Sequence, residues 1–154
     1  MKAVYAVVLL GIAAIYAAAL WQPARQLQLH QANLLRAVEK RNWERFARFI
    51  ADDYSDRWGH DKEFVLRESR EVFRQFLFLT VHHEVRAMQI LDQKGTVVAR
   101  IELAGSGGPL ADLARGRVNA LSEPFTFRWR QRSWKPWDWQ LVEVDQPELD
   151  ISEM

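Results

Sequence analysis

The chain has 154 residues, of which 49% are hydrophobic and 12% aromatic, and its formal net charge is +1. This length is typical of one domain with a real core, and the composition excludes a disordered chain. Once Lys2 is set aside, basic and acidic residues balance, so the charge gives no long-range attraction to nucleic acid. The chain has no cysteine, which excludes disulfides, thiolate catalysis and Cys-based metal sites.

An apolar segment opens the chain. Residues 3–21 read AVYAVVLLGIAAIYAAALW, without a charge. A membrane span needs about 17–25 residues and the apolar part of a cleaved signal about 7–15, so the length favours a transmembrane anchor with Trp21 at the membrane interface. Ala17 and Ala19 form an A-x-A site, and a secreted or periplasmic protein cleaved near Ala19 is the alternative. Lys2 predicts a cytoplasmic N-terminus and a domain outside the cytoplasm.

The rest of the chain is expected to form one domain, because no internal repeat or low-complexity tract divides it. Residues 1–21 are assigned to the anchor or signal peptide and residues 22–30 to a linker. The folded domain is expected over residues 31–147, followed by a C-terminal tail over 148–154.

Three helices are predicted after the leader, because apolar residues recur there at spacings of three and four. The first covers residues 26–40. Asn42 can cap a second helix over 43–51, and Asp61 can cap a third over 62–77.

Beyond the third helix the apolar period changes to alternation, which predicts strands. The strands are expected at 79–91, 96–104, 124–133 and 137–145, with turns at Lys94-Gly95 and Lys135-Pro136. Residues 105–122 begin with GSGGP and are expected to form a long irregular connection, with a helical turn at 110–115. Helices followed by an antiparallel sheet indicate an α+β fold.

The segment N-W-E-R-F-A-R-F-I-A-D-D-Y, residues 42–54, resembles the opening of nuclear transport factor 2-like and SnoaL-like domains. The later helix, the four strands and the closing W-x-W-Q-L-V-E-V are also similar, over about residues 31–147. The resemblance implies a cone-shaped, curved antiparallel sheet packed on about three helices, with an open pocket between them. Family members include ketosteroid isomerases, dehydratases, cyclases and non-enzymatic binding modules, and the resemblance also suggests a homodimer through the sheet.

The isomerase's catalytic residues are missing at the matching positions. Counting from the A-D-D motif at 51–53, the general base falls on Trp58 and the tyrosine donor falls near Leu34. Indole offers no base and leucine no donor, so the isomerase mechanism is not expected. The expectation for the fold is unaffected, because function depends on the site.

Asp56 is the first candidate for acid–base chemistry. If residues 54–58 form a strand, Tyr54, Asp56 and Trp58 share one face and look into the cone. Asp56 would then be a pocket base with Tyr54 as a donor, although an ion pair with a nearby arginine is an equally simple interpretation. His83 is the second candidate base. The expected pocket residues are Tyr54, Asp56, Trp58, Phe73, His83 and Trp129.

No metal, cofactor or nucleic acid is predicted. The chain has no H-x-H or H-E-x-x-H spacing, and adjacent strand residues such as His82 and His83 point to opposite faces. The segment FTFRWRQRSWKPWDW, residues 125–139, interleaves arginines with aromatics. A strand explains this pattern, with the arginines on a solvated face and Phe125, Phe127 and Trp129 on a buried one.

These observations predict an exported, membrane-anchored and non-enzymatic module that binds a small apolar ligand or a protein partner. The alternative is a lyase or isomerase-type enzyme acting on a small hydrophobic carbonyl compound, with Asp56 or His83 as its base.

Overall fold

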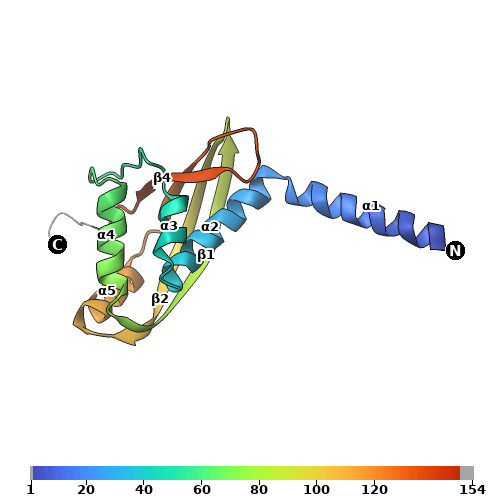
Figure 1. Ribbon diagram of the computed structural model, residues 1–154. Coiled ribbons are helices and arrows are strands. Elements are labelled where there is room, and N and C mark those ends of the chain that lie inside the picture. The colour runs from blue at the N-terminus through green and yellow to red at the C-terminus, as the bar shows by residue number, and fades with distance from the viewer. Residues whose placement is uncertain (1, 150–154) are drawn as a thin grey trace.

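A computed structural model describes residues 2–149 (Figure 1). Met1 and residues 150–154 of the expected tail lie outside the described residues. The described chain folds into α1 (Lys2–Leu20), α2 (Pro23–Glu39), α3 (Trp43–Phe49), α4 (Lys62–Phe73), β1 (Phe76–Leu91), β2 (Lys94–Gly107), α5 (Pro109–Ala120), β3 (Phe125–Gln131) and β4 (Trp139–Asp145). The α+β prediction is therefore confirmed.

Helix α1 projects away from the rest of the molecule (Figure 1). Its described apolar side chains have no core to enter: Leu10 and Ile15, for example, are 71% and 73% exposed. Within the described residues, no single helix has the length and apolar character needed to cross a membrane. The pair Val7–Ala19 and Pro23–Glu39, bent by 70°, meets that requirement by length and composition only.

Helix α2 begins within the segment that was expected to be a linker. Pro23 stands at its start, where a missing backbone N–H costs nothing. Leu27 is completely buried, and its packing against the sheet explains why Gly95 is needed: a Cβ there would lie 2.5 Å from Leu27 Cδ2. Deeper in the core, Trp129 Nε1 donates to Gln31 Oε1 at 3.0 Å, so the one polar atom of the indole is satisfied.

The four strands form one antiparallel sheet in the order β1-β2-β3-β4. The first turn is at Asp92-Gln93, where φ is 47° and 63°, two residues before the predicted Lys94-Gly95 turn. Positive φ at both central residues gives a turn whose twist matches that of the flanking strands.

The sheet is curved and open, and the helices cover its concave face (Figure 1). Its register shifts between Phe76 and Phe78 and between Val85 and Ala87 on β1, and again on β4, where Leu141 and Glu143 pair with the consecutive residues Trp129 and Arg128. Such bulges bend a strand and increase its local twist. The predicted cone-shaped arrangement is confirmed, and the bulges account for its curvature.

The end of α4 and the connection before β3 also differ from the prediction. Helix α4 ends at Phe73 instead of residue 77, because Phe76 already pairs with Gly107 in the sheet. The expected irregular connection contains the complete helix α5, which starts at Pro109 and places Ala111 in the core. Gly116 inside this helix and the glycines before it conceal the helical pattern in the sequence.

Helix α5 also closes an exposed edge of the sheet. Strand β3 pairs with β2 only as far as Ala99, so no strand among residues 2–149 pairs with the rest of β2 on that side. Asn119 fills the gap: its Nδ2 donates to the carbonyl of Leu103 at 2.9 Å, and its Oδ1 accepts the Leu103 N–H at 2.8 Å. The backbone groups of Leu103 that face away from β1 are thereby satisfied by a side chain instead of a strand.

Two glycines should respond oppositely to alanine. Gly105 has φ of 151°, and a Cβ there would lie 2.0 Å from the backbone oxygen of Phe78, so Gly105→Ala should lower the free energy of unfolding by more than about 1 kcal/mol. A Cβ on Gly116 would contact nothing within 4 Å, so Gly116→Ala in the same helix-and-strand unit should raise it by about 0.5–1 kcal/mol. Urea unfolding measures both, and equal responses would contradict the described backbone.

Candidate functional site

A cavity of about 330 Å³ lies between the helices and the concave face of the sheet. Its volume falls at the lower end of the range of about 300–1,000 Å³ for small-molecule pockets. Its walls are mainly apolar side chains from α2, α4 and all four strands: Leu34, Leu35, Val38, Phe64, Val65, Val72, Phe73, Val81, Ile101, Leu103, Phe125, Phe127, Leu141 and Val144.

Helix α4 forms one wall, and its apolar side chains are only partly buried against the core. Phe64, Val65, Val72 and Phe73 give it an apolar face toward the cavity, yet none of its residues is fully buried. An amphipathic helix normally buries that face against its neighbours. Here the face borders empty volume, which leaves room for an apolar guest between α4 and the sheet.

The chain between α3 and α4 makes a tight turn where an extended segment was expected. Ser55 N–H still donates to the carbonyl of Val142 at 3.1 Å, but the strand stops there. Asp56 Oδ1 then accepts the backbone N–H groups of Trp58 and His60, both at 2.9 Å, and Gly59 adopts φ of 81°. This hydrogen-bonded turn, and not strand alternation, places Asp56 and Trp58 at the cavity.

The sequence prediction missed four polar residues that line the cavity, namely His60, Glu68, Ser69 and Gln146, and His60 is the one paired with Asp56. Its Nδ1 lies 3.0 Å from Asp56 Oδ2, and its ring stacks on Phe64 at 3.9 Å between centroids. Both side chains of the pair are largely buried. With Asp56 ionised, Nδ1 must donate, which leaves Nε2 of a neutral imidazole as an acceptor. The four-residue spacing in D-R-W-G-H, with a turn glycine before the histidine, was the available signal.

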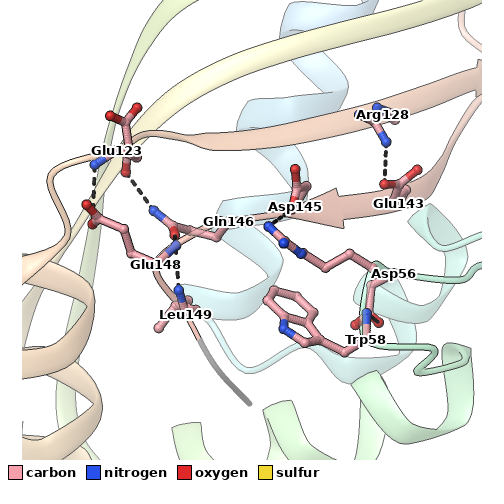
Figure 2. Close-up of polar contacts among 10 residues, drawn as sticks. Asp56, Trp58, Glu123, Arg128, Glu143, Asp145, Gln146, Glu148 and Leu149 are labelled. Atoms are coloured by element: carbon pink, nitrogen blue, oxygen red, sulfur yellow. Dashed lines mark hydrogen bonds and ion pairs between the residues drawn. The ribbon is translucent and has the colours of Figure 1, made fainter. Parts of the chain in front are cut away.

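An ion pair fixes this turn to the sheet. Arg57 Nη1 lies 3.1 Å from Asp145 Oδ1 at the end of β4, and the guanidinium lies 5.9 Å from the centre of the Trp58 ring. Figure 2 shows the turn that carries Asp56 and Trp58 beside Asp145 on the strand. The contact holds Trp58 at the edge of the cavity, where it lines the wall.

Gln146 closes the same end of the cavity just beyond β4. Its side chain is completely buried, and its Nε2 donates to the carbonyl of Glu123 at 2.7 Å. Its Oε1 accepts the N–H groups of Glu148 and Leu149 at 2.6 and 3.2 Å (Figure 2). These bonds anchor the end of the described chain beside the start of β3, so Leu149 also lines the cavity.

Tyr54 is buried in the wall nearest to β4. Burial raises the pKa of its phenol well above the ordinary value, and the charge of Asp56 raises it further. A hydrogen bond with the backbone of Val144 opposes this rise only in part. Tyr54 therefore stays protonated and can donate a hydrogen bond, but it is a poor proton donor in acid–base chemistry.

His83 and Trp129 were expected in the pocket, and neither lines the cavity. His83 shares a strand face with Val81 and pairs with Ile101, but it lies on the edge strand β1 and stays exposed. Partial desolvation lowers the pKa of its imidazole. Trp129 is buried in the filled part of the core against Gln31. Tyr54, Asp56, Trp58 and Phe73 do line the cavity.

The two carboxylates that precede the turn are bonded to basic side chains. Arg130 makes two hydrogen bonds to Asp53, at 2.6 and 2.9 Å, and Lys62 lies 2.8 Å from Asp52. These hydrogen bonds lower the pKa of both carboxyl groups. Over the described residues, no group of three or more His, Asp or Glu side chains is arranged to hold a metal ion.

The raised pKa of Tyr54 gives a testable pH dependence. Above the ordinary value of 10.0 the unfolded chain loses the phenol proton while the folded chain keeps it, so stability must fall as the pH rises beyond about 10. Tyr54→Phe should remove up to about 1.4 kcal/mol of this loss per pH unit. Tyr16→Phe, at an exposed position of α1, is the control and should keep the wild-type profile in urea unfolding. Identical profiles for all three proteins would contradict the burial of Tyr54.

Comparisons with known proteins bear on the fold. A scan against models of protein families finds no match, and neither does a search of curated proteins. Among solved structures, Bd1075 from Bdellovibrio bacteriovorus is 7% identical with a TM-score of 0.60, over 79% of this chain and 38% of that one. This chain therefore spans well under half of that protein's length.

Two further structures are similar over nearly their whole length. A candidate dehydratase of the nuclear transport factor 2-like family, from Streptomyces avermitilis, is 14% identical with a TM-score of 0.58, over 79% of this chain and 93% of that one. A nuclear transport factor 2-like protein from Cytophaga hutchinsonii is 14% identical with a TM-score of 0.54, over 77% of this chain and 91% of that one. The predicted resemblance is thus confirmed at the level of architecture: the chain has the nuclear transport factor 2-like fold.

Proposed function

We propose that this protein is an exported, membrane-anchored module that binds a small, mainly apolar ligand in its cavity and carries out no catalysis. The observation that carries the proposal is the cavity of about 330 Å³ behind α4, with its apolar walls. Burying apolar ligand surface there would contribute roughly 25 cal/mol for each Å² removed from water. The polar groups at one end would orient a ligand that carries a single polar substituent.

The polar end sets the expected chemistry of that substituent. Asp56 already accepts three hydrogen bonds from the turn and the imidazole, so it offers little to a ligand. His60 Nε2 receives no hydrogen bond from the described residues and is the natural acceptor for a ligand hydroxyl. The best-fitting ligand class is therefore a compact hydrophobic molecule with one hydrogen-bond donor.

The proposed anchoring rests on α1. Its described apolar side chains are exposed all around the helix, so they gain nothing from the folded domain. Insertion into a bilayer would bury them.

We also propose a homodimer through the outer face of the sheet. The Arg128–Glu143 and Arg100–Glu102 ion pairs lie on that face and make it polar.

One observation favours the enzyme alternative, with a different histidine as the base. His83 cannot act with Asp56, because it is exposed and lies outside the cavity. The Asp56–His60 pair does lie at the cavity, and a carboxylate that orients an imidazole can support proton transfer at Nε2. A similar fold in a candidate dehydratase is consistent with a lyase acting on a small carbonyl compound. Conversion of such a compound that disappears in His60→Gln would support this alternative.

Filling the cavity should weaken ligand binding. Val72 lies on the cavity face of α4, so Val72→Trp should weaken binding of the uncharged probe N-phenyl-1-naphthylamine at least about tenfold, or 1.4 kcal/mol. Leu113→Trp is the matched control, because Leu113 is exposed on α5 and does not line the cavity. Probe fluorescence measures the affinity, and urea unfolding checks that both variants fold.

Binding to α1 or to lipid would add the same background in both variants, so the difference between them reports on the cavity. Saturable binding that Val72→Trp and Leu113→Trp reduce equally, or no saturable binding at all, would overturn the proposed ligand site.

Anchoring has its own test. Cell fractionation should place the protein in the membrane fraction, and N-terminal sequencing should find the leader intact, because its apolar run is as long as a membrane span. A soluble mature chain beginning just after Ala19 would replace the anchor by a cleaved signal.

A further inference from the structure

Two exposed tryptophans meet where α1 joins the folded domain, and a third lies on the same connection between strands. Trp21 is 52% exposed, and Trp134 and Trp137 in the connection between β3 and β4 are 75% and 45% exposed. The rings of Trp21 and Trp137 meet edge to face with their centres 5.4 Å apart. The connection therefore lies directly beside the end of α1, and Figure 1 shows it descending toward the start of α2.

The exposure of these rings does not come from a loose loop. Arg132 N–H donates to the carbonyl of Asp138 at 2.8 Å, and Gln131 Nε2 donates to the carbonyl of Lys135 at 2.8 Å. Trp139, at the foot of the same connection, is buried and donates to the carbonyl of Pro136 at 2.8 Å. These hydrogen bonds within the connection hold its backbone in place, so its exposed tryptophans project from an ordered segment.

Large aromatic rings that are fixed and exposed indicate an interaction surface. Trp combines a wide apolar ring with one polar N–H, and it is enriched at the boundary between the acyl chains and the headgroups of a bilayer. Here the rings continue the exposed apolar surface of α1 without a gap, because Trp21 is in contact with Trp137. Arg25 and Lys135 are exposed beside them, and their positive charges suit anionic headgroups.

We propose that the β3–β4 connection, residues 132–138, rests in the headgroup region of the membrane, with Trp134 and Trp137 embedded beside Trp21. This inference rests on the proposed anchoring by α1. The second contact would fix the orientation of the domain relative to the bilayer. The occupant of the surface is a lipid membrane and not a protein partner, because the surface is continuous with the segment that would enter the bilayer.

The absence of cysteine allows a clean test. Lys135→Cys in the full chain, labelled with an environment-sensitive fluorophore, reports on the loop while all three tryptophans remain. Leu113→Cys, exposed on α5, is the control site away from α1. In vesicles of phosphatidylcholine and phosphatidylglycerol, headgroup-level nitroxide lipids should quench the label at 135 at least about twofold more than the label at 113. Adding Trp134→Ser should reduce that quenching.

The outcomes separate the inference from the anchoring proposal. Protein that floats with the vesicles but shows no quenching at 135 overturns the membrane contact of the loop and leaves the anchor intact. Equal quenching at 135 and 113 also overturns it, because the domain would then lie on the bilayer without a preferred face. Failure to bind vesicles overturns both proposals. Self-association that Trp134→Ser abolishes, without quenching, would assign the surface to a second copy of the chain.

Discussion

The packing of α2 into the concave face of the sheet is the contact on which the other features depend. The N-terminal half of the helix packs directly on the sheet: a Cβ at position 95 would lie 2.5 Å from Leu27 Cδ2, and Gln31 satisfies the indole of Trp129. In the C-terminal half, Leu34 and Val38 are buried in the core and also line the cavity. One helix therefore divides the cone into a filled part near α1 and a hollow part under α4, and it gives the molecule both its stability and its open volume.

Most of the architecture could be predicted because it follows local rules. Helical spacing and the caps Asn42 and Asp61 located α3 and α4, and both caps accept the expected backbone N–H in the structure. The errors arose where tertiary contacts override local signals. Helix α5 follows a glycine-rich segment and contains Gly116, so its pattern resembles a loop. The β1–β2 turn uses Asp92 and Gln93 with positive φ, although Lys94-Gly95 has the stronger turn composition.

The candidate site was only partly predictable, for a different reason. Tyr54, Asp56 and Trp58 lie at the cavity, but strand alternation was the wrong explanation for their position. His60 depends on a hydrogen bond to Asp56 that closes the turn, and periodicity does not reveal such a bond. His83 points along the expected strand face, yet its place on an edge strand leaves it in solvent. Alternation predicts which face a residue occupies, but not whether another element covers that face.

The side-chain amide of Asn119 has a consequence for assembly. By bonding both backbone groups of Leu103, it occupies the place that a residue of an incoming strand would take. An uncovered strand margin is a template on which further chains can add, and this is how many sheets begin to aggregate. A single amide from α5 blocks that template in the middle of the part of β2 that β3 leaves uncovered. Two molecules held close together on one surface would therefore be unable to join their sheets through this stretch of β2.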